Sequence, residues 1–453
     1  MEFDLLVRNG DVVFPEHGVV PADIGVSSGK IAAILAPGTP VGGARRELDA
    51  AGLHVMPGLI DAHMHIAIAG TEDAYATETA FAAAGGFTTV LTYLLQSVAY
   101  SEVFAREKEK VQSQAYIDVG FHFGMAKEEH LAELGHYVRQ YGVVSFKNFM
   151  NFKNDEGLYL GLTGTDDGYL LDLVRDVAGY EGVTLVIHAE DIEIVRRWRA
   201  RLQEQGRDGL RAWADSKPPI NEAENTRRVM YYAESVGCPL YFPHANSLLT
   251  LNEIREYRKH YPRIWLETCP AYLTHTYDSE VGNLGKANPP LRSQEDREAL
   301  WDALADGTID VVASDHVPRK KSTKTGSVWQ ASQGFPGTAY ILPVLLSEGY
   351  HKGRLDLKRV SQLVAANPAK AFGLDRRKGG IFVGADADLT LVDLGKEVTV
   401  DGASLGSFAD YSLYDGWKFK GWPVTTIVRG ELVMEDSVIT GNPGWGEYIA
   451  RPC

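Results

Sequence analysis

Cysteine is scarce in this sequence, since only Cys238, Cys269 and Cys453 occur among 453 residues. They are too few and too scattered for a disulfide framework, which excludes the small disulfide-stabilised secreted folds. The sequence also lacks any run of about eighteen apolar residues, so no membrane span is expected. Residues 1–18 carry charges within their apolar stretches and do not have the pattern of a signal peptide. We therefore expect a cytoplasmic protein without a membrane partner.

The sequence has fewer basic than acidic residues. The chain has 45 lysines and arginines against 60 aspartates and glutamates, which gives a net charge of -15. Surfaces that bind nucleic acid or anionic membranes are basic, so both classes of partner are excluded. Hydrophobic residues make up 45% of the chain, enough for a large buried core. A small molecule is the expected partner.

Helical patterns are missing from the start of the chain. Residues 4–54 read as short strands separated by tight turns at Asn9-Gly10 and Ser28-Gly29. The same texture returns in residues 386–393 and 425–435. We therefore predict that residues 1–54 and 373–453 form one small β domain, with residues 55–372 as a larger domain between them.

The larger domain alternates apolar, strand-like runs with helical segments. Eight such runs are found: 55–60, 87–95, 116–124, 143–150, 183–188, 240–244, 264–268 and 309–314. Continuous hydrophobicity is typical of parallel strands covered on both faces, and segments such as 166–180 and 293–306 supply the crossover helices. The second helix opens with a capping-box-like start at Ser293. The pattern predicts an eight-stranded parallel (β/α)8 barrel, whose chemistry lies at the carboxyl ends of the strands.

Five of these strand ends carry side chains that suit a metal site. The six candidates are His63, His65, Lys147, His188, His244 and Asp315. Imidazole and carboxylate suit zinc or its neighbours, and two histidines spaced by two in a strand point to one face. Taken singly, the histidines could be core residues, the lysine a surface residue and the aspartate a helix N-cap. Their coincidence on one barrel rim favours the metal site.

Lys147 is the unusual member of the set. It lies among Val143, Val144, Phe146 and Phe149, where a charged ammonium is costly, and an ammonium cannot bind a cation. A deprotonated amine that captures carbon dioxide becomes a carbamate, an anionic ligand that can bridge two cations. Other polar groups of the rim need no such role: His122 and His316 could support the ligands, and Cys269 reads as a small buried hydrophobe.

The residues also carry a family resemblance. The chain resembles the cyclic amidohydrolases of the hydantoinase, dihydropyrimidinase and allantoinase group, most specifically in segments 57–65, 84–89, 145–150, 289–292, 314–316 and 384–389. This resemblance implies a TIM barrel with a small β-sandwich made from both termini. It also implies two zinc-type ions, with manganese or cobalt as alternatives, bridged by N6-carboxylated Lys147 and a hydroxide. A homotetramer or homodimer is expected.

The resemblance further assigns roles to the ligands. His63 and His65 should hold the more buried ion together with Asp315, and His188 and His244 the more exposed one. The two cations would generate a bridging hydroxide near neutral pH and polarise the ring carbonyl. Asp315 is the expected catalytic residue, which takes the hydroxide proton and delivers it to the departing ring nitrogen. A cyclic amide then opens to an acyclic acid.

Several substrate-contacting positions depart from the family pattern. Phe152 stands where a tyrosine five residues beyond the lysine stabilises the oxyanion, so Asn151 or Tyr159 would have to donate instead. Asn288 and Gln333 replace a serine and an asparagine at positions that contact substrate mainly through their backbone. Segment 66–70 lacks an arginine that would meet a carboxylate or ureido group, which favours an apolar pocket. We therefore expect atypical or narrow substrate use.

Three alternatives remain open at this stage. A mononuclear deaminase of the same superfamily would need no lysine bridge, and a non-catalytic relative would have lost ligands that are all present here. A hydrolase of an atypical cyclic imide or heterocyclic amide would keep the same site with a different ring.

Overall fold

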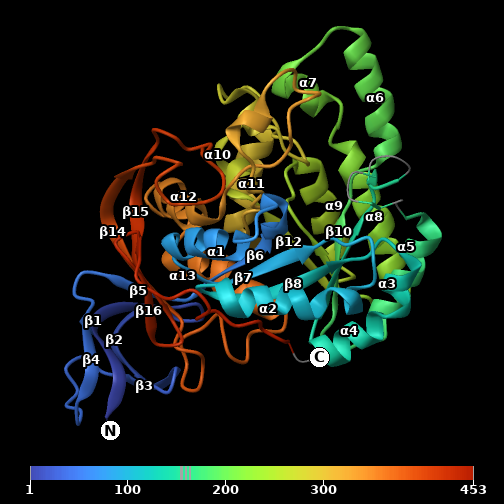
Figure 1. Ribbon diagram of the computed structural model, residues 1–453. Coiled ribbons are helices and arrows are strands. Elements are labelled where there is room, and N and C mark those ends of the chain that lie inside the picture. Colours follow the sequence, from blue (N-terminus) through green and yellow to red (C-terminus); the bar gives the residue numbers. More distant parts are fainter. Residues whose placement is uncertain (1, 154–156, 159–160, 163–164, 452–453) are drawn as a thin grey trace.

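A parallel β-barrel forms the centre of the molecule. The computed structural model describes residues 2–153, 157–158, 161–162 and 165–451. Within them, eight parallel strands follow one another in chain order around the barrel (Figure 1). They are β6 (Leu59–Met64), β7 (Phe87–Leu94), β8 (Asp118–Gly124), β9 (Ser145–Phe149), β10 (Thr184–His188), β11 (Leu240–Phe242), β12 (Ile264–Thr268) and β13 (Val311–Val312). A parallel bridge between Met64 and His316 joins the first strand to the segment after the last. The predicted (β/α)8 barrel is confirmed.

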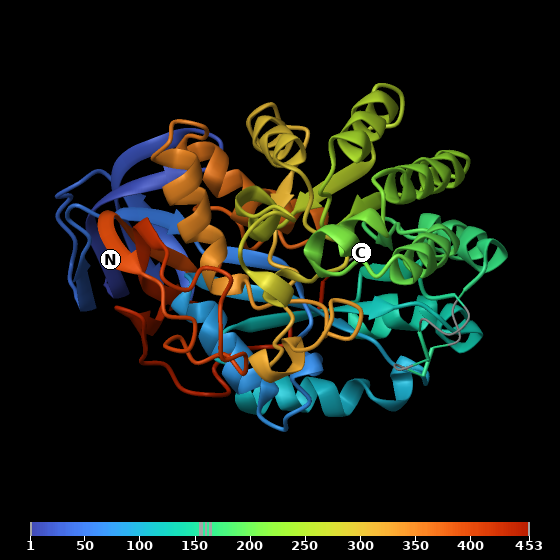
Figure 2. The ribbon, with the colours of Figure 1, turned by 90° about the horizontal axis from the view of Figure 1, so that it is seen from above.

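Helices cover the outside of this barrel (Figure 2). Their bounds are α1 (Ala74–Ala84), α2 (Phe104–Gln114), α3 (Glu128–Ala132), α4 (Leu134–Tyr141), α5 (Asp167–Ala178), α6 (Ile192–Glu204), α7 (Gly209–Asp215), α8 (Ile220–Glu234), α9 (Leu248–Arg258), α10 (Pro270–Thr274), α11 (Gln294–Ala305), α12 (Ile341–Val344), α13 (Leu357–Ser361) and α14 (Asn367–Ala371). The predicted capping box is present at α11, where Ser293 and Asp296 each bond the other's backbone. No helix of the described chain is long and apolar enough to cross a membrane.

Strands from both ends of the chain form a second sheet. Its members are β1 (Phe3–Phe14), β2 (Gly18–Ser27), β3 (Lys30–Leu35), β4 (Ala44–Asp49), β5 (His54–Pro57), β14 (Leu389–Thr399), β15 (Lys418–Val428), β16 (Glu431–Glu435) and β17 (Val438–Ile439). Strands β5 and β14 pair antiparallel and so join the two halves. Figure 1 shows the blue and red strands side by side. Apolar side chains of both halves share one core, as a small terminal β-sandwich requires.

The first barrel strand begins later than the sequence predicts. The apolar run 55–60 is divided, because β5 pairs with β1 and β14 of the terminal sheet whereas β6 belongs to the barrel. Gly58 lies between the two strands, and its N–H donates to the carbonyl oxygen of Asp388 at 2.7 Å. A Cβ at this position would lie 2.6 Å from the Cβ of Asp388, so only glycine fits where the chain passes from one sheet to the other.

A buried ion network links the barrel to the terminal sheet. The Lys378 ammonium lies 2.7 Å from Asp118 at the start of β8, 3.1 Å from Asp386 and 2.5 Å from Asp388, all of them buried. The three carboxylates lie close enough together to suggest a cation site. The lysine occupies that place itself, so the group is a salt-bridge cluster.

Candidate metal centre and substrate pocket

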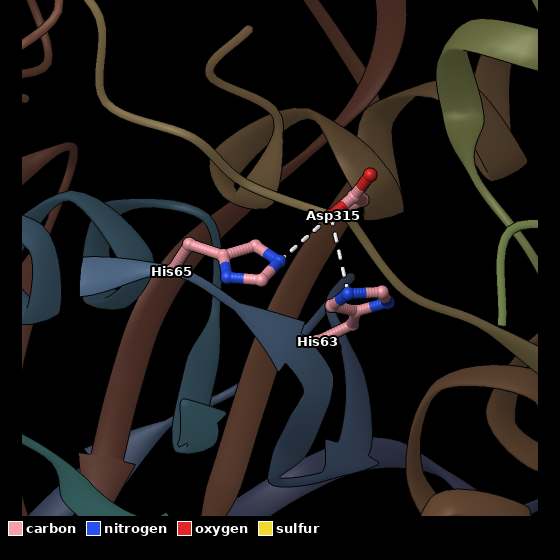
Figure 3. A group of neighbouring side chains, drawn as sticks. All are labelled: His63, His65 and Asp315. Carbon is pink, nitrogen blue, oxygen red and sulfur yellow. Dashed lines mark ion pairs between the residues drawn. The ribbon is translucent and has the colours of Figure 1, made fainter. Parts of the chain in front are cut away.

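Strand β6 and the loop after β13 bring three of the predicted ligands together. The Nε2 atoms of His63 and His65 lie 3.1 and 3.2 Å from the Oδ1 atom of Asp315. Figure 3 shows both imidazoles directed at the carboxylate. Burial would raise the pKa of Asp315, but His63, His65 and Lys147 together outweigh burial and lower the pKa to about 2. The aspartate is therefore ionised at neutral pH and could bind a metal ion.

Lys147 projects from the middle of β9 into the same cluster. Its Nζ atom lies 3.0 Å from Nε2 of His63 and 4.1 Å from the centre of the Tyr93 ring, and the residue is 1% exposed. Burial lowers the pKa of this amine to about 8. A sizeable fraction of the amine is then uncharged near neutral pH, which is the form that reacts with carbon dioxide.

The last two predicted ligands lie at the ends of β10 and β11. Nδ1 of His188 and Nε2 of His244 are 3.0 Å apart, and the His244 ring centre is 5.5 Å from that of His63. On its other side, His188 contacts Glu190 at 2.9 Å, and Glu190 pairs with Lys217. The structure therefore brings all six predicted ligands into one cluster at the carboxyl side of the barrel, with Lys147 within β9 and not at its end; five of the six are buried and Asp315 is partly buried.

Two of the ligands have unusual backbone conformations. His244 and Asp315 both have φ of 48°, in the left-handed region that residues other than glycine seldom adopt. Such strain persists only where the surrounding structure holds it, and it concentrates at functional sites. His244 lies two residues beyond β11 and Asp315 three residues beyond β13, where the chain turns at the rim of the barrel.

Three buried carboxylates support the ligands, and the sequence analysis did not single them out. Glu267, at the end of β12, contacts Nδ1 of His63 at 2.8 Å and accepts bonds from the Tyr241 hydroxyl and the His244 N–H. Asp61 accepts from the backbone N–H groups of His63 and Ser314. Glu190 is the third. Glu267 lies near the end of a barrel strand, as most of the predicted ligands do, and this position is the feature of the sequence that could have identified it.

The donor set fits divalent metal ions. Burial is the main cause that lowers the pKa of each ligand histidine, so the four imidazoles are neutral and keep a lone pair for a cation at neutral pH. One ring nitrogen of His63, one ring nitrogen of His65 and one carboxylate oxygen of Asp315 lie within 4.8 Å of one another. Glu267 fixes the orientation of His63 from the side away from the cluster, as carboxylates do for metal-bound histidines.

The other polar groups that the sequence placed near the rim are His122, His316 and Cys269. His122 contacts the Ala62 carbonyl through Nε2 at 3.0 Å and also bonds Ser145. His316 contacts Glu78 at 2.8 Å. Cys269 is buried, and burial raises the pKa of its thiol well above the ordinary value, so no reactive thiolate is available.

A pocket of about 640 Å³, including its open mouth, lies above the cluster. Of the predicted substrate contacts, Phe152, Asn288 and Gln333 line it, and Tyr159 lies outside the described residues. Phe152 stacks on Phe149 with ring centres 4.6 Å apart. The side-chain amide of Asn288 donates to Oε1 of Gln333 at 2.6 Å.

The rest of the lining is mostly apolar, with two further polar members. The apolar side chains are Ile68, Leu95, Phe149, Phe152 and Val317. Asn151 also lines the pocket, and its side-chain oxygen is buried without a hydrogen-bond partner among the described residues. Arg319 is the other polar member. The expectation of an apolar pocket therefore holds for most of the wall but not at Arg319.

Comparisons with known proteins agree with this geometry. The profile of the amidohydrolase family matches residues 54–433. The chain is 32% identical to a D-hydantoinase from Ralstonia pickettii over 99% of both proteins. It is 35% identical to an allantoinase from Solibacter usitatus, over 97% of this chain and 96% of the relative. The crystal structure of a dihydropyrimidinase from Brevibacillus agri matches with a TM-score of 0.91 at 28% identity, over 99% of this chain and 98% of the other.

Proposed function

Since this chain belongs to the amidohydrolase family, we propose that it is a metal-dependent hydrolase that opens a cyclic amide, such as a hydantoin or a dihydropyrimidine. The observation that carries the proposal is the single cluster of six metal-compatible side chains, five of them buried, at the floor of a small-molecule pocket. The reaction adds water across a C–N bond of the ring, and the product is an acyclic acid.

We assign the ligands to two ions. His63, His65 and Asp315 would hold the deeper ion, and His188 and His244 the outer one. Lys147, once its uncharged amine has added to carbon dioxide and released one proton to form the carbamate, would supply the anionic ligand that both ions share. Support comes from the pKa of about 8 and from the 3.0 Å contact with His63. Zinc is the proposed metal, with manganese or cobalt as alternatives.

The protein's own groups then carry out most of the chemistry. When bound, the two ions supply an activated water and polarise the ring carbonyl. Asp315 accepts the proton of that water and passes it to the ring nitrogen as the C–N bond breaks. The apolar wall with Phe152 excludes other water from the reacting atoms. Asn151 is the proposed donor to the developing oxyanion in place of a tyrosine hydroxyl.

A bridged pair of ions is favoured over a single ion. A mononuclear deaminase has no use for a lysine among its ligands, whereas Lys147 lies in direct contact with His63. Phe152 favours a ring other than a simple hydantoin, so a cyclic imide or a heterocyclic amide is the second candidate substrate. We further propose that the enzyme acts in the cytoplasm as a homotetramer or homodimer.

A combined metal and substrate measurement tests the proposal. Hydantoins, dihydropyrimidines, allantoin, dihydroorotate and cyclic imides are offered to enzyme loaded with zinc or manganese, and metal is counted per chain. We expect two ions and turnover of at least one cyclic amide. Robust turnover of both dihydrouracil and simple hydantoins would contradict the atypical substrate range, and no turnover across the panel would contradict the activity.

Replacing Lys147 tests the bridge itself. Lys147→Ala should abolish activity and the stable binding of two ions, because the anionic ligand between them is lost. The matched control is Lys259→Ala just after α9, whose lysine side chain is 69% exposed, and it should keep both ions and full activity. Two tightly bound ions persisting in Lys147→Ala would refute the bridge.

A further inference from the structure

Arg319 lines the pocket but has no part in the proposed mechanism. It lies four residues beyond Asp315, on the loop that leaves β13, and the same pocket is lined by His65, Lys147 and His188. Its guanidinium is partly buried beside apolar wall residues such as Val317. A cation held against an apolar wall is costly unless a counter-charge meets it.

No described residue supplies that counter-charge. The backbone N–H of Arg319 donates to the Val317 carbonyl at 2.9 Å, but the Nε atom of its side chain is buried without a hydrogen-bond partner in the described chain. Other partly buried arginines do meet acids, as Arg258 meets Asp310 and Arg429 meets Asp118. Several described arginines have a buried nitrogen without a hydrogen-bond partner, and Arg319 is the one among them that lines the pocket.

Two buried lysines near Arg319 do not replace its charge. Lys324 and Lys286 are both buried, and each amine bonds only a carbonyl oxygen in the described chain: Lys324 that of Lys286 at 3.2 Å, and Lys286 that of Ala331. Burial, Lys286 and Arg319 lower the pKa of Lys324 to about 7, and burial lowers the pKa of Lys286 to about 8, so both amines are only partly protonated near neutral pH. Arg319 is therefore the permanent positive charge on this side of the pocket.

The nearby neutral groups do not provide a better partner for a polar substrate. The side-chain amide of Asn288 donates a hydrogen bond to Oε1 of Gln333 at 2.6 Å, so this donor and this acceptor are already paired with each other. The remaining wall around Ile68, Leu95 and Phe152 offers apolar surface. A guanidinium, in contrast, presents a planar pair of donors that matches a carboxylate.

We propose that Arg319 selects a cyclic amide that carries a carboxylate on its ring or on a short ring substituent. This inference rests on the proposed hydrolysis of cyclic amides and names the substrate class of that same site. The carboxylate pairs with the guanidinium, and the ring amide lies over the metal ligands. Arg319 is thus a specificity-determining residue that the pattern of the metal ligands does not reveal.

The test uses substrate pairs that differ in charge and little in shape. Hydantoin-5-acetic acid is compared with hydantoin-5-acetamide, and dihydrouracil-6-carboxylic acid with its amide, on metal-loaded enzyme. In at least one pair the acid should exceed the amide in kcat/KM by roughly 10- to 150-fold, the range for a hydrogen bond to a charged group. Arg319→Gln should bring that ratio close to one, and Arg319→Lys should leave an intermediate ratio, because a lysine keeps the charge without the paired donors.

A neighbouring lysine provides the matched control. Lys321 lies two residues after Arg319, and its side chain is exposed. Lys321→Gln removes the same charge and should preserve the acid-to-amide ratio of kcat/KM. An acid-to-amide ratio near one in the wild type, or an unchanged ratio in Arg319→Gln, would overturn the assignment. Hydrolysis of the amides in the same assay would still support the proposed function. If neither member of a pair is hydrolysed, calorimetric binding of the same compounds decides: tighter binding of the acid that disappears in Arg319→Gln supports the assignment, and equal binding overturns it.

Discussion

At the scale of single residues, Glu267 shows how a metal site depends on groups that do not bind the metal. Its carboxylate is 0% exposed and bonds His63, His244 and Tyr241 at once. It thereby fixes which nitrogen of His63 faces the cluster. The ligand histidines were found from the sequence because they are chemically distinctive at strand ends. A glutamate at a strand end has many uses, so its type and position alone do not identify its partners.

Replacing Glu267 by glutamine should weaken metal binding. The amide keeps the shape but has one acceptor oxygen in place of two, so it cannot accept from His63, the His244 N–H and the Tyr241 hydroxyl together, and metal affinity should fall by about 10- to 100-fold. Competition with a chelator of known affinity measures the change. Tyr241→Phe is the control, because it removes one bond to Glu267 and leaves the contacts with both histidines. Equal metal affinity in Glu267→Gln and the wild type would show that the second acceptor oxygen has no role in the site.

At the scale of secondary structure elements, the sequence predicted the strands well and their junctions less well. Continuous apolar runs located all eight barrel strands, since parallel strands buried on both faces require them. The first run hid the passage from β5 to β6, because hydrophobicity does not change there and only Gly58 marks it. The left-handed backbone at His244 and Asp315 was not predicted either, since it arises from the closure of the barrel rim and not from local preference.

The junction at Gly58 provides a test at this scale. A Cβ there would overlap Thr88 and the side chain of Asp388, so Gly58→Ala should shift β6 and lower the free energy of unfolding by about 1–3 kcal/mol. Because β6 carries His63 and leads directly into His65, metal content should fall as well. Urea denaturation and metal analysis measure both effects. Gly395→Ala is the control, since the nearest atom to its added Cβ lies 3.4 Å away; similar behaviour of the two variants would contradict the packing argument.

At the scale of the whole molecule, the pairing of the two chain ends was predictable and the path of the C-terminal segment was not. Both ends had strand-like texture without long helices, and they form one sheet. The final segment then returns to the barrel, where Tyr448 bridges Val119 and Arg451 is buried with its guanidinium on Ser145. One arginine in a short polar tail has no periodic pattern, so its burial could not be predicted from the sequence.

The ion network around Lys378 holds the barrel and the terminal sheet together, and it leads to a prediction about pH. Burial would raise the pKa of Asp386, but Lys378, Lys30 and Arg377 outweigh burial and lower it to about 2, from an ordinary value of 3.8. The folded protein therefore binds this proton less tightly than the unfolded chain does. The resulting stability is complete above about pH 4 and is lost as the pH falls through about 2.

Asp386→Asn should therefore destabilise the protein in a pH-dependent way. At pH 7 the free energy of unfolding of metal-free protein should fall by up to about 3 kcal/mol, because Lys378 keeps Asp118 and Asp388 as partners. Urea denaturation at several pH values should show the difference from the wild type shrinking between pH 4 and pH 2. Asp436→Asn is the control, since its pair with Lys396 is largely exposed and worth roughly 0–1 kcal/mol. A difference that stays constant down to pH 2 would mean that Asp386 acts through packing and not through its charge.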